Sequence, residues 1–210
     1  MATMGVQDGV GRPGMGDGAP VPTSLTLSLP DAVADVVASP GKTSTVEDRM
    51  GLVLRLAAAN VADGGGPFAA AVFNMGSGEL IAGGVNMVVP ASIPIAHAEI
   101  VALALAGQRL GTFDLTVHGP VELVTSCEPC AMCLGAVPWG GISRVVSAAR
   151  DEDARAIGFD EGDKPTAWAE SLRRRGIEVL EDVRREEASD VLRSYVRAGG
   201  PIYNGTGGVQ

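Results

Sequence analysis

Apolar and polar positions follow one another along the chain in a pattern that predicts helices and strands in turn. Thr45 opens a capping-box sequence, and the apolar residues after it recur at helical spacing, which predicts a helix there. Residues 68–73 and 79–89 are apolar runs on either side of a glycine-containing turn, which predicts a β-hairpin. Gly83 and Gly84, inside the second run, indicate a bulge or a close approach of another backbone.

The same pattern continues toward the C-terminus and defines an α/β domain. Helices are predicted over 97–110, from 129 to about 140, over 166–175 and over 186–197, and strands over 121–125, 144–149 and 177–180. Because strands and helices alternate in the second half, we expect parallel neighbours there, and hence a mixed five-stranded sheet between helices.

The two ends of the chain differ from this domain. Residues 1–22 are rich in glycine and proline and predict a disordered stretch, whereas residues 23–41 are more apolar and are expected to drape over the domain or over a partner subunit. We therefore divide the chain into an N-terminal arm, 1–41, and one domain, 42–210, whose last residues form a tail.

Composition narrows the functional classes. The chain has 210 residues, a net charge of −9 and a pI of about 4.7, which disfavours binding to a nucleic-acid backbone and favours a small free substrate. It contains three cysteines, so a disulfide framework is not expected. Neither a signal peptide nor a membrane-spanning run is recognisable, and a cytoplasmic location fits these features.

The candidate chemistry lies in Cys130 and Cys133, three residues apart, and in His97 upstream. Pro129 is a favourable first residue of a helix, which places both sulfurs on one face near the positive end of the helix dipole. His97 lies at the start of another predicted helix. Two thiolates and one imidazole form a tetrahedral zinc site with one open position, the arrangement of catalytic rather than structural zinc. A cysteine redox pair would not need the histidine.

Other polar residues near these motifs divide into functional and structural candidates. Glu99 is the expected proton carrier for a water made acidic at the open position of the metal. Cys127 lies outside the turn that aligns the other sulfurs, and we interpret it as a small buried side chain, although a third thiolate would close the site. Glu128 is interpreted as a helix-start residue and His118 as a surface histidine.

His-x-Glu followed by Pro-Cys-x-x-Cys resembles the signature of the zinc nucleobase deaminases. The resemblance extends from about Met50 to Tyr203, and within that superfamily the chain is most similar to the bacterial guanine deaminases. The segments that carry it are Gly66-Pro67-Phe68-Ala69-Ala70-Ala71-Val72, Ala96-His97-Ala98-Glu99, Thr125-Ser126-Cys127-Glu128-Pro129-Cys130 and Gly158-Phe159-Asp160-Glu161-Gly162. It implies the three-layer α/β/α fold of cytidine deaminases.

The resemblance also implies roles for substrate-binding residues. Asn86 would hydrogen-bond the base, and Phe68 would pack its ring against it, while Trp139 is a further candidate for contact with the base. Glu161 would reach the amidine edge, because a carboxylate can accept from the N–H and NH₂ that guanine presents side by side. Tyr203 would close the pocket in its own subunit or in a partner, since relatives are dimers that exchange C-terminal segments.

These features predict hydrolysis of guanine to xanthine and ammonia, and thus a role in purine catabolism. Glu99 would move a proton from the attacking water to N3 and then, alone or with Glu161, to the leaving amino group. The alternatives are another amino-heterocycle such as ammeline, another aminopurine or cytosine, and tRNA adenosine, which the acidic pI and Glu161 disfavour. A non-catalytic zinc-stabilised binding protein is the rival from another class, and it would have no need of Glu99.

Overall fold

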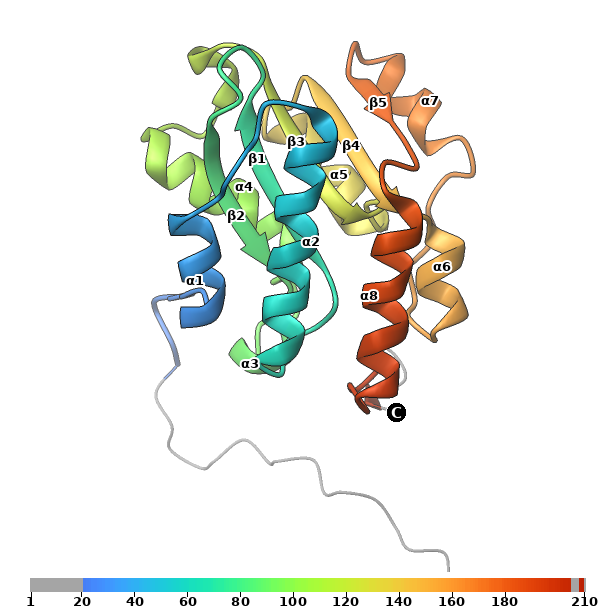
Figure 1. Cartoon of the computed structure of the whole chain (residues 1–210). Coiled ribbons are helices and arrows are strands. Elements are labelled where there is room, and N and C mark those ends of the chain that lie inside the picture. The colour runs from blue at the N-terminus through green and yellow to red at the C-terminus, as the bar shows by residue number, and fades with distance from the viewer. Residues whose placement is uncertain (1–20, 205–207, 210) are drawn as a thin grey trace, which may run out of the picture.

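A mixed five-stranded sheet forms the centre of this computed structural model, which describes residues 21–204 and 208–209 (Figure 1). The strands are β1 (Ala69–Asn74), β2 (Leu80–Val85), β3 (Val121–Cys127), β4 (Arg144–Ala149) and β5 (Glu178–Leu180). They lie in the order β2-β1-β3-β4-β5, antiparallel between β2, β1 and β3 and parallel between β3, β4 and β5. The predicted mixed sheet is therefore confirmed.

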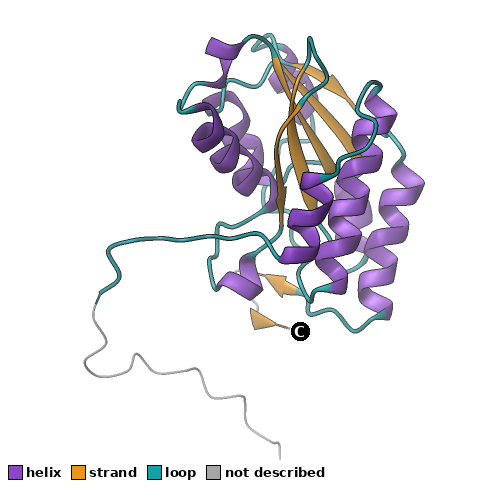
Figure 2. Cartoon of the chain, turned by 60° about the vertical axis from the view of Figure 1, so that its left-hand side comes forward, coloured by secondary structure: helices purple, strands orange, loops and turns teal. Residues whose placement is uncertain are grey.

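Helices cover both faces of the sheet (Figures 1 and 2). They are α1 (Asp31–Ala38), α2 (Val46–Ala62), α3 (Val88–Ala91), α4 (Ala98–Leu110), the 3-10 turn η1 (Leu115–His118), α5 (Ala131–Trp139), α6 (Asp151–Ala156), α7 (Trp168–Arg173) and α8 (Arg185–Arg197). The apolar side chains of α2 and α8 pack on one face, and those of α4, α5 and α7 pack on the other.

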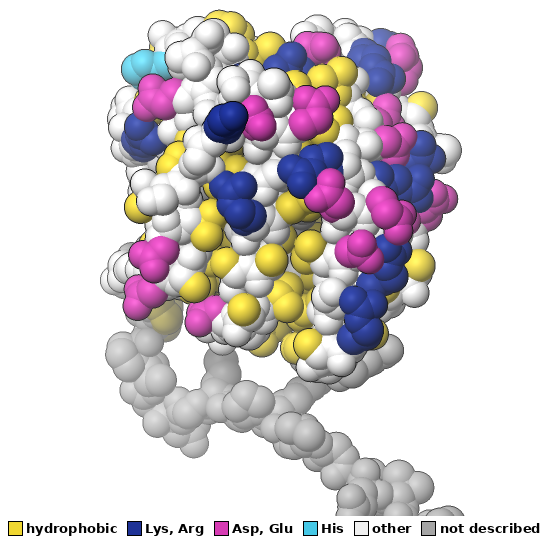
Figure 3. Space-filling view, viewed as in Figure 1, with side chains coloured by type: hydrophobic (Ala, Val, Ile, Leu, Met, Phe, Trp, Pro, Cys, Tyr) yellow, Lys and Arg dark blue, Asp and Glu magenta, His cyan; other side chains and the backbone are white. Residues whose placement is uncertain are grey.

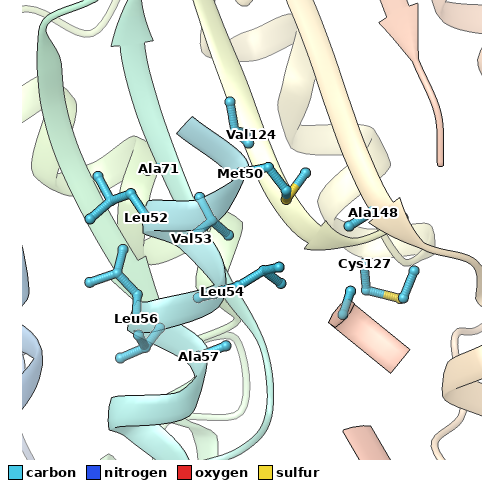
Figure 4. Packing of buried hydrophobic residues seen from close by; sticks show 14 of the residues in the cluster. Met50, Leu52, Val53, Leu54, Leu56, Ala57, Ala71, Val124, Cys127 and Ala148 are labelled. Atoms are coloured by element: carbon cyan, nitrogen blue, oxygen red, sulfur yellow. The ribbon is translucent and has the colours of Figure 1, made fainter. Parts of the chain in front are cut away.

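The alternation of side chains along β1 explains why both faces are covered. Ala69, Ala71 and Phe73 belong to the hydrophobic cluster under α2, whereas Ala70 and Val72 belong to the cluster under α4, and all are fully buried. Figure 4 shows apolar side chains of α2 lying over the strands that carry Ala71 and Val124. A strand that is apolar on both faces needs cover on both faces, and the two layers of helices provide it.

Two local features of the sequence have the predicted consequence. The Thr45 side chain accepts a hydrogen bond from the Asp48 N–H at 3.0 Å, and Asp48 accepts from the Thr45 N–H at 3.2 Å, which completes the capping box of α2. Gly84 marks a close approach rather than a bulge, because a Cβ there would lie 2.4 Å from the Ala98 carbonyl oxygen of α4. This contact brings α4, with its preceding histidine, tightly against β2.

The structure corrects two predicted boundaries and adds one helix that was not predicted. The second strand ends at Val85 and not at 89, because the side chain of Asn86 accepts from the Val88 N–H at 3.2 Å and the short helix α3 follows. Helix α5 begins at Ala131, so Pro129 precedes the helix instead of opening it. The apolar pattern predicts no element over 150–165, yet α6 forms there, with an Arg150 N–H to Asp153 hydrogen bond of 2.8 Å at its start.

The predicted disordered stretch at the start of the chain lies, except for residues 21 and 22, outside the described residues. Within the more apolar part of the arm, α1 forms and buries Val33 in the hydrophobic cluster under α2. Near the other end, β6 (Tyr203–Asn204) pairs with β7 (Gly208–Val209) in an antiparallel ladder. Among the helices of the described part, none is both long and apolar enough to span a membrane.

Candidate metal and nucleobase site

Three metal-ligating side chains converge where β3 ends and two helices begin. His97 is the N-cap residue of α4, Cys130 is the N-cap residue of α5, and Cys133 lies in the first turn of α5. One donor atom of each lies within 4.8 Å of the donor atoms of the other two, and the Cys130 Sγ is 3.4 Å from Nδ1 of His97. Because both helices start at one edge of the sheet, residues 33 positions apart meet.

The hydrogen bonds among these groups favour ionisation of one sulfur, that of Cys130. A hydrogen bond from Cys133 and a second from His97 outweigh burial and lower the pKa of the Cys130 thiol to about 4. The hydrogen bond to Cys130, burial and the charge of Glu99 raise the pKa of the Cys133 thiol, which keeps its proton. Burial acts against the imidazolium of His97, but its hydrogen bond to Cys130 prevails and raises the pKa. Sulfur and imidazole donors in a group of three are typical of a zinc site that keeps one position open.

Cys127 does not join this group of donors. It is the last residue of β3, it is buried, and its sulfur lies 3.5 Å from the Arg150 carbonyl oxygen. Burial raises the pKa of its thiol well above the ordinary value, which keeps it protonated. Within the described residues the donor group thus consists of His97, Cys130 and Cys133, in agreement with the interpretation of Cys127 as a small buried side chain.

Glu99 lies beside the sulfur atoms. It is in the first turn of α4 and only 7% exposed, with Oε2 3.3 Å from the Cys133 Sγ and Oε1 3.4 Å from the Thr125 hydroxyl. Burial, followed by the nearby Cys130 thiolate, raises the pKa of this carboxyl above its ordinary value. A carboxyl group with a raised pKa next to a metal site is suited to taking up and releasing a proton.

A cavity of about 620 Å³ opens over these residues, within the range usual for small-molecule sites. Seven of the side chains predicted for the site line it: Phe68, Asn86, His97, Glu99, Cys130, Glu161 and Tyr203. Cys133 is fully buried beneath them. The structure therefore brings together, around one space, candidates that are separated by up to 135 positions in the sequence.

Trp139 is a predicted site residue that the structure does not bring to this cavity. It is the last residue of α5, its side chain is 87% exposed, and it is absent from the cavity lining. Cys133 and Trp139 are six positions apart, nearly two helical turns, so the helix carries Trp139 away from the metal-binding end. Within one chain the structure therefore places Trp139 away from the cavity, and a contact of Trp139 with the base stays a prediction.

Glu161 is held in the cavity wall by its backbone. Its carbonyl accepts a hydrogen bond from the Ala131 N–H at 3.0 Å, and its side chain is 7% exposed. The neighbouring Asp160 closes a turn by accepting from the Gly162 N–H at 2.9 Å. Burial, together with the charges of Cys130 and Glu99, raises the pKa of Glu161 to about 8.

Aromatic rings and amides complete the wall. Phe159 packs edge to face against Phe68 at 4.9 Å and against Tyr203 at 5.2 Å between ring centres. The Tyr203 hydroxyl is buried and has no hydrogen-bond partner among the described residues, so it is available to a ligand. Asn86 is 2% exposed, and its amide adds a donor and an acceptor to the cavity lining.

Sequence reasoning missed several lining residues and gave another a wrong role. Phe159, Asn204 and Thr125 line the cavity, and of these only Phe159 has a local signal, because the acidic residues Asp160 and Glu161 follow it. Glu128 does not cap α5. It forms an ion pair of 2.8 Å with Lys164, a residue that no sequence motif marks.

A family model described as the cytidine and deoxycytidylate deaminase zinc-binding region matches residues 43–149, and the chain belongs to this family. The match and the three converging donors confirm zinc as the cofactor. A guanine deaminase from Bacillus subtilis is 43% identical over 97 residues, which are 46% of this chain and 59% of that protein, so the alignment spans little more than half of this relative.

Solved structures extend the similarity over most of the chain. A guanine deaminase from Nitrosomonas europaea is 47% identical to this chain and superposes with a TM-score of 0.79. The alignment covers 84% of this chain and 98% of that chain. A structure in complex with 2,6-diaminopurine is 48% identical, covers 86% of this chain and 97% of its own, and has the same TM-score of 0.79. The recognised resemblance to bacterial guanine deaminases is thereby confirmed.

Proposed function

We propose that this protein is a zinc-dependent guanine deaminase that releases xanthine and ammonia. The observation that carries the proposal is one cavity whose wall holds both the metal donors with Glu99 and the buried carboxylate of Glu161. The similarity to guanine deaminases supports the choice of substrate. The cavity is large enough for a purine and is walled by aromatic rings, which suits a flat base.

His97, Cys130 and Cys133 would hold the zinc ion, which when bound supplies a Lewis acid and makes a water acidic near neutral pH. Glu99 takes a proton from the attacking water and delivers it to N3 of guanine. After attack at C2, Glu99 carries the proton of the new C2 hydroxyl to the amino group, which Glu161 holds. The amino group leaves as ammonia as the C2 carbonyl forms. The buried setting of Glu99 favours the first step, because a raised pKa makes its carboxylate a stronger base toward the attacking water.

Glu161 would also select the substrate. In its ionised form, whose share grows as the pH rises toward the pKa of about 8, the Glu161 carboxyl group accepts from N1–H and from the C2 amino group of guanine, two donors that lie side by side. Adenine presents a bare ring nitrogen beside its amino group, so one oxygen of the carboxylate would face another acceptor. Asn86 holds the base through its amide, Phe68 packs its ring against it, and Tyr203, which lines the cavity, offers its unpaired hydroxyl.

Release of ammonia from a panel of bases tests this function. The zinc-loaded protein is incubated with guanine, adenine, cytosine, cytidine and ammeline, and kcat/KM is determined for each. We expect kcat/KM for guanine to exceed that for adenine by at least about 100-fold. Adenine would leave a buried polar group of the site unpaired, and the loss of binding free energy corresponds to a factor of this size or more. A preference for another base, or no turnover of guanine, would reject the proposal in favour of a related deaminase or of a binding protein.

We further propose that the protein acts as a homodimer. Phe113, 93% exposed, lines a shallow groove between α4 and Gly140, and the exposed Trp139 is the residue before Gly140. Large exposed apolar side chains of this kind mark protein interfaces. Tyr203 and Asn204 line the cavity of their own chain, so exchange of C-terminal segments is not needed to complete the site. Sedimentation of the wild type should give a dimer mass, and of Trp139→Glu with Phe113→Glu a monomer mass.

Nucleic-acid substrates fit the surface poorly. On the face shown in Figure 3, arginine and lysine side chains lie among aspartate and glutamate side chains, many of them as ion pairs along α6 and α8. A chain with a net charge of −9 offers no general attraction to a phosphate backbone. A small free base is therefore the substrate class that we infer, and a cytoplasmic location stays a prediction.

A further inference from the structure

Lys164 is a buried lysine to which the chemistry proposed above assigns no task. Its side chain is 6% exposed, and Nζ lies 2.8 Å from Oε2 of Glu128 and 3.2 Å from Oδ1 of Asp151. The same ammonium group lies 5.3 Å from the ring centre of Trp168. Burying an ammonium ion is costly unless partners of this kind surround it, so the position of Lys164 needs an explanation.

The ion pair joins the two segments on which the proposed chemistry depends. Glu128 stands between β3 and α5, two residues before Cys130, and its own side chain is 9% exposed. Lys164 follows Glu161 by three residues in the loop between α6 and α7. A second link runs in parallel, because the Ala131 N–H donates to the Glu161 carbonyl at 3.0 Å. The metal-binding helix start and the Glu161 loop are thus tied at two points.

The remainder of the Glu161 loop is fixed to α6 and to the C-terminal ladder. Arg155 donates to the Gly162 carbonyl at 2.9 Å and pairs with Asp151 at 2.5 Å, and Asp151 also contacts Lys164. On the other side, Asn204 accepts from the Asp160 N–H at 2.9 Å. Of these contacts, only the ion pair between Lys164 and Glu128 joins the loop to the metal-binding segment by side chains of both.

We propose that Lys164 and Glu128 form a positioning pair that sets Glu161 at the distance from the metal donors that guanine requires. The inference rests on the proposed function, since it assigns Glu161 to the amidine edge of the base. Lys164 acts through the loop and touches no reacting atom. Positioning is favoured over mere stabilisation because a buried ion pair contributes little net stability compared with apolar residues of similar size.

The test separates positioning from stability with two variants. Lys164→Met leaves the buried Glu128 charge without its partner and is expected to lower Tm as well as loosen the loop. The double variant Glu128→Gln with Lys164→Met removes both charges, so Tm should recover while the tie stays absent. Glu161→Gln is the reference for lost recognition, and Arg193→Gln, in an exposed ion pair, is the matched control. Zinc content is measured in every variant.

Kinetics with two bases provide the first readout. Guanine presents N1–H beside its C2 amino group, whereas 2,6-diaminopurine presents a bare N1. For the double variant we expect KM for guanine to rise about 10-fold while kcat is nearly kept. The ratio of kcat/KM for guanine to kcat/KM for 2,6-diaminopurine should fall toward the ratio found for Glu161→Gln. Arg193→Gln should match the wild type.

Hydrogen exchange of the zinc-loaded proteins is the second readout and needs no turnover. Amides of residues 158–164 should exchange faster in the double variant, while those of β1 and β3 stay unchanged. The positioning role would be overturned if the double variant had the KM, the base preference and the amide exchange of the wild type. It would also be overturned if kcat/KM fell equally for both bases and amides exchanged faster throughout the protein. Absence of guanine turnover in the wild type would instead reject the proposed function.

Discussion

Glutamine at position 99 is expected to lower guanine turnover by about 100- to 10,000-fold, the usual contribution of a general acid and base. The Glu99→Gln side chain keeps the size and the hydrogen bond from Thr125 but can no longer accept and release a proton. The donors His97, Cys130 and Cys133 are unchanged, so zinc content should stay that of the wild type. Steady-state ammonia release and metal analysis of the same samples measure both quantities.

A matched substitution shows whether the loss comes from the position of the carboxyl group. Glu186 is on α8, and its side chain is 84% exposed, so Glu186→Gln should leave turnover and zinc unchanged. If Glu99→Gln turned over guanine as fast as the wild type, another group would have to move the proton, and the proposed mechanism would be wrong. Loss of zinc from Glu99→Gln would assign Glu99 a structural part in the metal site instead.

The metal site could be predicted because its information is local. Spacing alone places Cys130 and Cys133 in one turn, and His97 and Glu99 in another. Only the contact between these two segments depends on the tertiary structure. The alternation of strand and helix predicted that fold, since β3, α5 and β4 make a parallel unit whose carboxyl edge carries the site.

The remainder depended on contacts between distant segments. Trp139 lies on the same helix as the sulfurs, and only the helical rotation and the boundary at Ala131 show that it points elsewhere. Lys164 sits in a loop without periodic pattern, and its partner Glu128 is 36 positions away, so no local rule predicts their pairing. The packing of Phe159 between Phe68 and Tyr203 likewise joins three regions of the chain.

Serine at position 133 is expected to remove the metal, and with it turnover. A serine hydroxyl does not ionise near neutral pH and is a poorer ligand for zinc than a thiolate. Substitution of a residue that only supports a metal ligand lowers metal affinity by up to about 100-fold, so loss of a ligand itself should lower the affinity for zinc by more than about 100-fold. Zinc per chain after dialysis should fall from one toward zero, and ammonia release should fall in proportion.

Cys127→Ser is the matched control for that experiment, because it makes the same chemical change in a buried cysteine three residues before Cys130. The Cys127 sulfur lies against the Arg150 carbonyl oxygen, which a serine hydroxyl can also reach as a donor. Zinc should therefore stay bound in Cys127→Ser. If both serine variants lost zinc alike, the metal would have three sulfur ligands and no open position, and a site closed in that way could not perform hydrolysis.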